Sequence, residues 1–284
     1  PWQSMIAKIM PANRRGTFFG MQAAAANLLF AGGALISGVL LQQLPSPLDF
    51  TLSFLICGLW MSVSWFFLRM TREEETEPHN AEALRGGFWA QSGKILRQDK
   101  NFRWFLVVRN LFNFAMMAFG FYTVYAVQTF GMNEATAGVM TSVLAGVQIV
   151  ANPVLGLLGD RTGHRLILAG GAVSAVISAG LAWFAPSVGW FYVVFLFAGL
   201  TSVAYWTIGM SMTLEFGSEQ DRPAYIGLAN TLTAPTSILA PLFGGWLADQ
   251  AGYTVTFGLA VISALITLSV LIFILRDPRH LRAS

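Results

Sequence analysis

The sequence predicts an all-α membrane protein with eight transmembrane helices. Three observations lead to this fold class: long apolar runs, few charges, and basic residues confined to alternate gaps. Of the 284 residues, 55% are hydrophobic and 11% are charged, against about 25% charged in a soluble chain. The apolar runs lack the alternation of half-buried strands, so we expect helices, which satisfy their own backbone hydrogen bonds in lipid.

Eight apolar runs are each long enough to cross a bilayer, which takes about 20 residues. In chain order they are Phe18–Leu41, Phe50–Leu68, Trp104–Thr129, Ala135–Leu158, Leu166–Phe184, Val188–Met212, Ala224–Ala248 and Tyr253–Leu275.

The basic residues support this count. Alternate gaps hold no Lys or Arg: Gln42–Asp49, Phe130–Glu134, Ala185–Ser187 and Asp249–Gly252. Of the 17 basic residues, Arg109 alone falls within a span, and all the others lie in the remaining segments. By the positive-inside rule, we expect both chain ends in the cytoplasm of a cell whose inner or plasma membrane the chain crosses several times. Because the basic residues are dispersed over short loops, the lipid bilayer is the expected partner and nucleic acid is not.

The starts of the first and seventh spans are similar. Arg15 and Gly20 have the same spacing as Arg222 and Gly227, and the two pairs are offset by 207 residues. Six spans separate the copies, so both enter the membrane from the same side. The sequence therefore predicts a parallel repeat of six-helix halves.

The ten residues from Gly156 to Arg165 form the most specific motif. They read Gly-Leu-Leu-Gly-Asp-Arg-Thr-Gly-His-Arg, between the fourth and fifth spans. This resembles the cytoplasmic loop signature of the major facilitator superfamily of secondary transporters. The resemblance implies a twelve-helix fold of which this chain holds the last eight helices, and we expect an N-terminal portion to be missing. It implies a remnant of the N-terminal half over residues 1–70, a cytoplasmic linker over 71–102 and a complete C-terminal half over 103–284. Within the linker, Glu82–Arg97 is equally compatible with a surface helix and with disorder.

The resemblance also gives this loop a role. In the family, it meets the N-terminus of a helix in the opposite half and helps to lock the cytoplasmic gate. We expect Asp160 to approach the backbone N–H groups of residues 14–20, with Arg161 and Arg165 fixing its geometry. Gly156, Gly159 and Gly163 would allow close packing and the turn. His164, which stands where the family has Arg or Lys, is expected to be a plain exposed loop histidine rather than a pH-sensitive contact. The alternative is an ordinary short loop whose Arg residues set topology.

The seventh span contains Pro241, Gly244 and Gly245. They resemble the Gly-Pro-x-x-Gly-Gly element that exporters of the family carry in the fifth helix. The equivalent stretch of the first span lacks the Pro and one Gly. The element predicts a kink and close helix packing, and is weak evidence for export.

Polar side chains at membrane depth are the candidates for a substrate cavity. They are listed by span: Asn113 and Met117 in the third, Gln148 and Asn152 in the fourth, Tyr205 and Trp206 in the sixth, and Asn230, Thr233 and Ser237 on one face of the seventh. Such a lining suits an uncharged or amphipathic organic solute. The alternative for each residue is a helix–helix hydrogen bond or core packing. Arg109 is expected to snorkel to the interface, or else to act as counter-ion for an anionic substrate.

No Asp, Glu or His lies mid-membrane in any expected span. An intramembrane protease cannot be assembled from these residues, and no phosphate-binding Gly-x-x-x-x-Gly-Lys loop is present. We therefore expect no enzyme activity, no metal and no cofactor. The predicted function is secondary transport of a small organic molecule by alternating access, with efflux slightly favoured and a proton or sodium ion as candidate coupling ion. The alternative is a transporter-like sensor or a lipid flippase.

Overall fold

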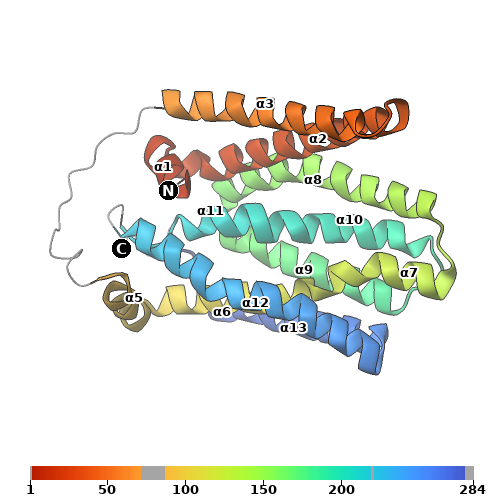
Figure 1. Cartoon of the computed structure of the whole chain (residues 1–284). Coiled ribbons are helices and arrows are strands. Elements are labelled where there is room, and N and C mark those ends of the chain that lie inside the picture. Colours follow the sequence, from red (N-terminus) through yellow and green to blue (C-terminus); the bar gives the residue numbers. More distant parts are fainter. Residues whose placement is uncertain (1, 72–86, 219–220, 279–284) are drawn as a thin grey trace.

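A computed structural model of the chain describes residues 2–71, 87–218 and 221–278. Within these ranges the structure is helical and contains no strand. The long helices lie side by side with their axes roughly aligned (Figure 1). The all-helical fold predicted from the sequence is therefore confirmed.

The helices begin and end close to the expected spans. Their bounds are α1 Trp2–Ile9, α2 Arg15–Gln43, α3 Leu48–Met70, α5 Gly87–Gln98, α6 Lys100–Met116, α7 Tyr122–Phe130, α8 Glu134–Thr162, α9 His164–Trp183, α10 Trp190–Val203, α11 Gly209–Thr213, α12 Arg222–Ala251 and α13 Tyr253–Phe273. A 3-10 segment, η2 (Met117–Phe121), joins α6 to α7, and a π-helical segment, η3 (Ala204–Ile208), joins α10 to α11. The third and sixth spans are thus each continuous through one irregular turn.

Among the described residues, seven helices are long and apolar enough to cross a membrane. They correspond to the second through eighth expected spans. The first expected span lies in α2, a 29-residue helix that is not among these seven. The count of eight spans stays a prediction at that helix.

Local sequence signals explain several helix ends. Asp99 caps α6 by accepting a hydrogen bond from the Phe102 amide at 2.8 Å, and Asn133 caps α8 through the Thr136 amide at 2.8 Å. Both are preferred N-cap residues. Helices α2 and α12 begin at Arg15 and Arg222, the two positions that the internal repeat aligned.

The core is formed mainly by the C-terminal helices. Aromatic side chains of α6, including Phe102, Phe105 and Phe112, pack with residues of α9, α12 and α13. A second cluster joins Tyr122 of α7 to Phe191 of α10 and Phe257 of α13. By contrast, α3 has none of its most apolar 18-residue window buried. Helix α3 therefore lies at the outside of the described bundle (Figure 1).

The connector between α3 and α6 is described only in part. Helix α5 covers Gly87–Gln98, which overlaps the Glu82–Arg97 segment for which a surface helix was one of two expectations. Residues 72–86 lie outside the described set. The predicted domain boundaries stay predictions.

Helices α2 and α8 pack backbone to backbone at three glycines. A Cβ atom on Gly156 would overlap the Gly16 carbonyl oxygen, and one on Gly20 would overlap the Asn152 carbonyl oxygen. Close approach of this kind is what small residues allow between helices in a membrane. The start of α2 is thereby held against the end of α8.

We expect Gly156→Val to destabilise the protein by about 1–3 kcal/mol, because the added atoms must push α2 away from α8. The matched control is Gly146→Val on the same helix, where an added Cβ meets nothing within 4 Å. The melting temperature of the purified protein in detergent is the measurement. Equal melting temperatures for the two variants would contradict the close packing.

Candidate functional site

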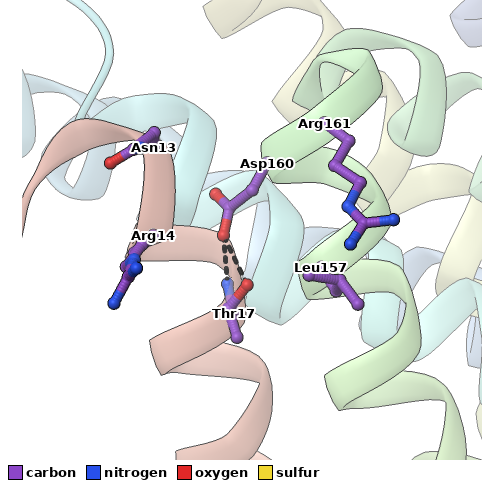
Figure 2. Close-up of a pocket in the computed structure, with 6 residues that line it drawn as sticks. All are labelled: Asn13, Arg14, Thr17, Leu157, Asp160 and Arg161. Carbon is purple, nitrogen blue, oxygen red and sulfur yellow. Dashed lines mark hydrogen bonds between the residues drawn. The ribbon is translucent and has the colours of Figure 1, made fainter.

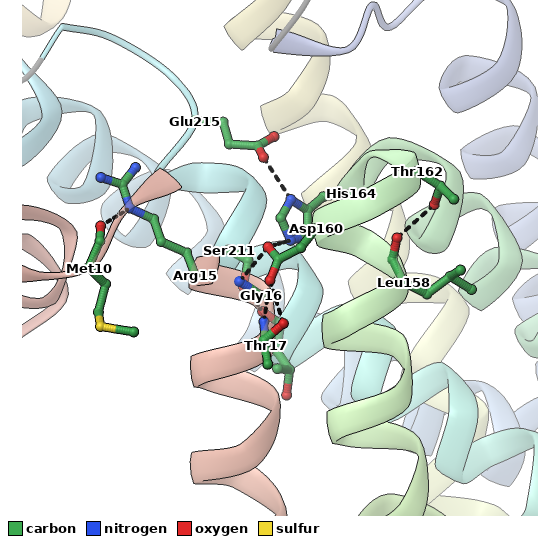
Figure 3. Close-up of polar contacts among 11 residues, drawn as sticks. Met10, Arg15, Gly16, Thr17, Leu158, Asp160, Thr162, His164, Ser211 and Glu215 are labelled. Atoms are coloured by element: carbon green, nitrogen blue, oxygen red, sulfur yellow. Dashed lines mark hydrogen bonds and ion pairs between the residues drawn. The ribbon is translucent and has the colours of Figure 1, made fainter. Parts of the chain in front are cut away.

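Asp160, in the last turn of α8, binds the first turn of α2. Its Oδ2 accepts two hydrogen bonds from Thr17, at 2.6 Å from the amide and 2.7 Å from the hydroxyl (Figure 2). Its Oδ1 accepts one from the Gly16 amide at 2.9 Å (Figure 3). The first amides of a helix have no intrahelical partner and carry partial positive charge. The carboxylate therefore accepts hydrogen bonds from amides that have no other helical partner, and it lies at the positive end of the helix dipole. The contact was expected from the family resemblance.

His164 lies behind Asp160 and is fully buried. Its Nδ1 is 2.7 Å from Glu215 Oε1, and its Nε2 is 3.7 Å from Asp160 Oδ1 (Figure 3). The expectation of an exposed loop histidine is wrong, because α9 begins immediately after Gly163 and its first side chain turns into the bundle. The sequence signal that could have predicted this contact is Glu215, because an acid at the end of the sixth span needs a polar partner.

The two loop arginines do not both serve Asp160. Arg165 donates from Nε to the Leu271 carbonyl at 2.7 Å and from Nη2 to the Ile272 carbonyl at 2.6 Å. The expectation that Arg165 fixes the geometry of Asp160 is therefore wrong. The last carbonyls of α13 attract it, since a helix C-terminus carries unsatisfied acceptors and partial negative charge.

Arg161 is exposed. With Asn13, Arg14, Thr17, Leu157 and Asp160 it lines a cavity of about 480 Å³ (Figure 2). On the α2 side, Arg15 is buried and its Nε donates to the Met10 carbonyl at 3.2 Å. The start of α2 is thus tied to the residue that follows α1, as well as to α8.

The loop glycines serve the turn. Gly163 ends α8 with φ of 98°, a conformation that residues with a Cβ rarely adopt. A Cβ on Gly159 would lie 2.8 Å from Cδ2 of the His164 ring. Gly163 allows the turn between α8 and α9, and Gly159 leaves room for the His164 ring against the end of α8.

The repeat-related residues on α12 lie as follows. Arg222 is the first residue of the helix and is buried, and Gly227 lies in its second turn. Pro241 is inside the helix, and Gly244 faces the third span, where an added Cβ would lie 3.0 Å from Phe121. Gly245 lies farther from the same ring, at 3.7 Å.

Several expected cavity residues form a hydrogen-bonded network between the third, sixth and seventh spans. The Tyr205 hydroxyl donates to Asn113 Oδ1 at 2.5 Å, and Asn113 Nδ2 donates to the Thr236 hydroxyl at 2.9 Å. That hydroxyl donates in turn to Asn110 Oδ1 at 2.5 Å. Met117, one turn beyond Asn113, is buried. In this arrangement Asn113 makes a helix–helix contact, the alternative considered for each of these residues.

The polar residues of α8 behave in the same way. Gln148 Nε2 donates to the Ser202 hydroxyl at 3.1 Å, and Asn152 Oδ1 accepts from the Thr207 hydroxyl at 2.6 Å. Both bonds join α8 to the sixth span. They fix the register of these two helices on each other.

The three polar residues of α12 do not share one environment. Thr233 is buried and bonds the Ala229 carbonyl, whereas Asn230 and Ser237 are exposed. These three residues lie at the edge of the face by which α12 packs against α6 and α13, so only Thr233 is covered. Trp206, in η3, keeps 60% of its surface exposed.

Arg109 does not extend to the membrane interface as expected. Its Nη1 donates to the Tyr205 carbonyl at 2.6 Å, and its Cζ lies 4.3 Å from the centroid of the Tyr205 ring. The snorkelling prediction is therefore wrong, because the carbonyl and the aromatic ring of Tyr205, on the sixth span, hold the guanidinium inside the bundle.

The sequence and the fold were compared with known proteins. The family model described as Major Facilitator Superfamily matches residues 1–127 and 111–284. Relatives include the probable vesicular acetylcholine transporter-B of Danio rerio, 32% identical over 42% of this chain and 24% of that protein. The tetracycline resistance protein, class H, of Pasteurella multocida is 28% identical over 48% of this chain and 34% of that protein. The probable 4-methylmuconolactone transporter of Cupriavidus pinatubonensis is 27% identical over 55% and 37%.

These matches cover well under two thirds of each relative. Among solved structures, the human organic anion transporter MFSD10 superposes with a TM-score of 0.76 at 15% identity, over 95% of this chain and 66% of that one. The transporter FucP in its outward conformation gives 0.73 at 16% identity, over 98% and 71%. At these identities the superpositions show the fold. The relatives and neighbours are transporters and not enzymes.

We expect His164 and Glu215 to be energetically coupled. His164→Ala removes the partner that Glu215 has at 2.7 Å, and losing a partner of a buried polar group costs about 1–3 kcal/mol. Adding Glu215→Gln to His164→Ala should therefore cost less than Glu215→Gln costs alone, as measured by melting temperature in detergent. The control combines His164→Ala with Asp249→Asn, an exposed residue near the end of α12, where the losses should add. Additive losses for the His164 and Glu215 pair would contradict the coupling.

Proposed function

We propose, from the premise that the chain belongs to the Major Facilitator Superfamily, that it acts in secondary transport of a small organic solute by alternating access. In this proposal the contact between Asp160 and α2 is the closed state of a gate at the end of the bundle where α2 begins and α8 ends (Figure 1). Both chain ends and this gate face the cytoplasm, as the distribution of basic residues predicts.

The observation that supports this proposal best is the set of three hydrogen bonds from Asp160 to Gly16 and Thr17. They join residues that are about half the chain apart, and they involve one carboxylate and one helix terminus. A contact of this kind can break as a unit when the helices separate. Its electrostatic part rests on charge near a helix dipole, which makes a modest contribution, so the closed state can form and open during a transport cycle.

The substrate proposal rests on the interior and on the relatives. The described spans contain amides, hydroxyls and aromatic rings away from their ends. The relatives named above are a probable acetylcholine transporter, a tetracycline resistance protein and a probable 4-methylmuconolactone transporter. A small organic solute agrees with both. Efflux is favoured over uptake by the resistance protein and by the Pro241 to Gly245 element.

The domain proposal follows the same family. Residues 1–70 would belong to the N-terminal half, 71–102 to the linker and 103–284 to the C-terminal half, with the two halves rocking about a central site. Across the boundary between these proposed halves, α2 packs on α8. The proposed coupling ion is a proton or sodium.

We expect Asp160→Asn to lower solute flux about tenfold. The substitution keeps the shape of the side chain but removes the charge that strengthens its bonds to the α2 amides. Flux of a solute panel that includes tetracycline and 4-methylmuconolactone would be measured in membrane vesicles, with the chain expressed from its natural reading frame and the pH gradient varied. Asp249→Asn, a charge removal at an exposed position, is the matched control and should transport normally.

Two results would count against the proposal. Unchanged flux in Asp160→Asn would remove the gate role from this contact. If the folded, inserted protein moved no solute of the panel at any gradient, the sensor or lipid flippase would become the better interpretation.

We expect Trp206→Ala to raise the apparent KM for a transported solute by roughly two- to tenfold, because an exposed ring in the membrane interior offers stacking worth about 0.5–1.5 kcal/mol. Trp190→Ala, at the first residue of α10, is the control for loss of a partly exposed Trp. An equal effect of the two substitutions on KM would show that Trp206 has no special role.

A further inference from the structure

We propose that Arg109 is an anion-binding residue, and that the solute is an organic anion: a carboxylate carried on an aromatic or apolar body. The inference deepens the transport function proposed above and rests on it. The structure supports it through the position of the guanidinium, its surroundings, and the irregular helix turn that receives it.

Arg109 is the tenth residue of α6, about 13 Å along the helix axis from its first residue, and the sixth residue of the span expected at Trp104–Thr129. In the seven described spans, no other Lys or Arg and no Asp, Glu or His lies more than two turns from a helix end. A cation at such a depth is costly, and intramembrane ionisable residues commonly mark a solute or ion pathway. The interior therefore carries one isolated positive charge.

Within the described chain, no carboxylate lies within ion-pair distance of this guanidinium. Its hydrogen bond there is the one from Nη1 to the Tyr205 carbonyl, at 2.6 Å. A guanidinium has five N–H donors, and its Nε is buried without an acceptor among the described residues. The side chain as a whole keeps part of its surface exposed. A half-buried guanidinium that has an unused buried N–H, and no carboxylate within reach among the described residues, can bind an anion.

The sixth span is shaped to receive Arg109. Residues Ala204–Ile208 form a π turn, in which the Gly209 amide bonds the Ala204 and Trp206 carbonyls. In an α-helix that amide would bond the Tyr205 carbonyl. The π turn thus releases the Tyr205 carbonyl, which accepts from Arg109 instead. Gly209 also makes room, since a Cβ there would overlap Arg109 Nη1. Such π turns are frequent at functional sites.

The residues beside the guanidinium define the second half of the ligand. The Tyr205 ring lies under Arg109 and meets the Trp206 ring edge to face, with centroids 4.9 Å apart. The Tyr205 hydroxyl is engaged by Asn113, so its ring is fixed, whereas Trp206 is 60% exposed. A carboxylate bound by Arg109 would place an attached aromatic or apolar body next to the Trp206 ring.

The test is equilibrium binding of radiolabelled acids to the protein in phosphatidylcholine nanodiscs. The probes are benzoate, 1-naphthoate and hexanoate, each compared with its neutral amide. At least one acid should bind about tenfold or more tightly than its amide, since a charge-assisted pair is lost in the amide. Arg109→Gln should abolish that preference and Arg109→Lys should retain part of it. Arg103→Gln, an exposed residue of the same helix, should leave binding unchanged.

The possible results separate this inference from the proposed transport function. Equal binding of acids and amides by the unmodified protein, or an acid preference that survives in Arg109→Gln, would overturn the anion site, even if the vesicles transport neutral solutes. Acid binding that depends on Arg109 supports the anion site, even if no flux is found. If Arg109→Gln does not fold, as judged by size-exclusion chromatography, the comparison of acids with amides and the Arg109→Lys variant decide the question.

Discussion

The arrangement of α2 on α8 depends on one constraint: the two backbones touch. Gly16 and Gly156 let the helices approach until neither position can carry a side chain. At that separation the short carboxylate of Asp160 reaches the first amides of α2. At a larger helix separation, the hydrogen bonds between those amides and the carboxylate could not form. The packing of the glycines therefore comes first, and the electrostatic contact follows from it.

The same region shows how charge is accommodated at the end of a membrane bundle. Asp160, His164 and Glu215 are all nearly covered, where a single unpaired charge would be costly. Each lies beside a partner of suitable polarity: helix amides for Asp160, and the imidazole for Glu215. The cluster brings together the end of α8, the start of α9 and the end of the sixth span, so a movement of any one of them changes the environment of the other two.

The sequence was sufficient to predict the parts of the structure that depend on local patterns. Hydropathy placed the second through eighth spans, and the family resemblance that the motif carries implied that Asp160 lies near the start of α2. It was not sufficient for His164 and Arg109, because the orientation of a side chain depends on neighbours from other helices. His164 turned inward toward Glu215, 51 residues away, and Arg109 turned toward Tyr205, 96 residues away. The π turn at Ala204–Ile208 has no signature in propensity, since it is stabilised by the tertiary contact that it permits.

The sixth span connects the proposed anion site with the proposed gate. Its π turn holds Tyr205 against Arg109. Glu215, which follows α11, contacts His164 beside Asp160. A π turn holds one residue more than the α-helical turn it replaces. If Arg109 left the Tyr205 carbonyl, the contact that favours the π turn would be lost, and a return to α geometry would move the following residues by about 1.5 Å along the axis and about a quarter turn around it. Because α11 follows at once, such a displacement would reach Glu215, and so would connect the proposed anion site to the proposed gate.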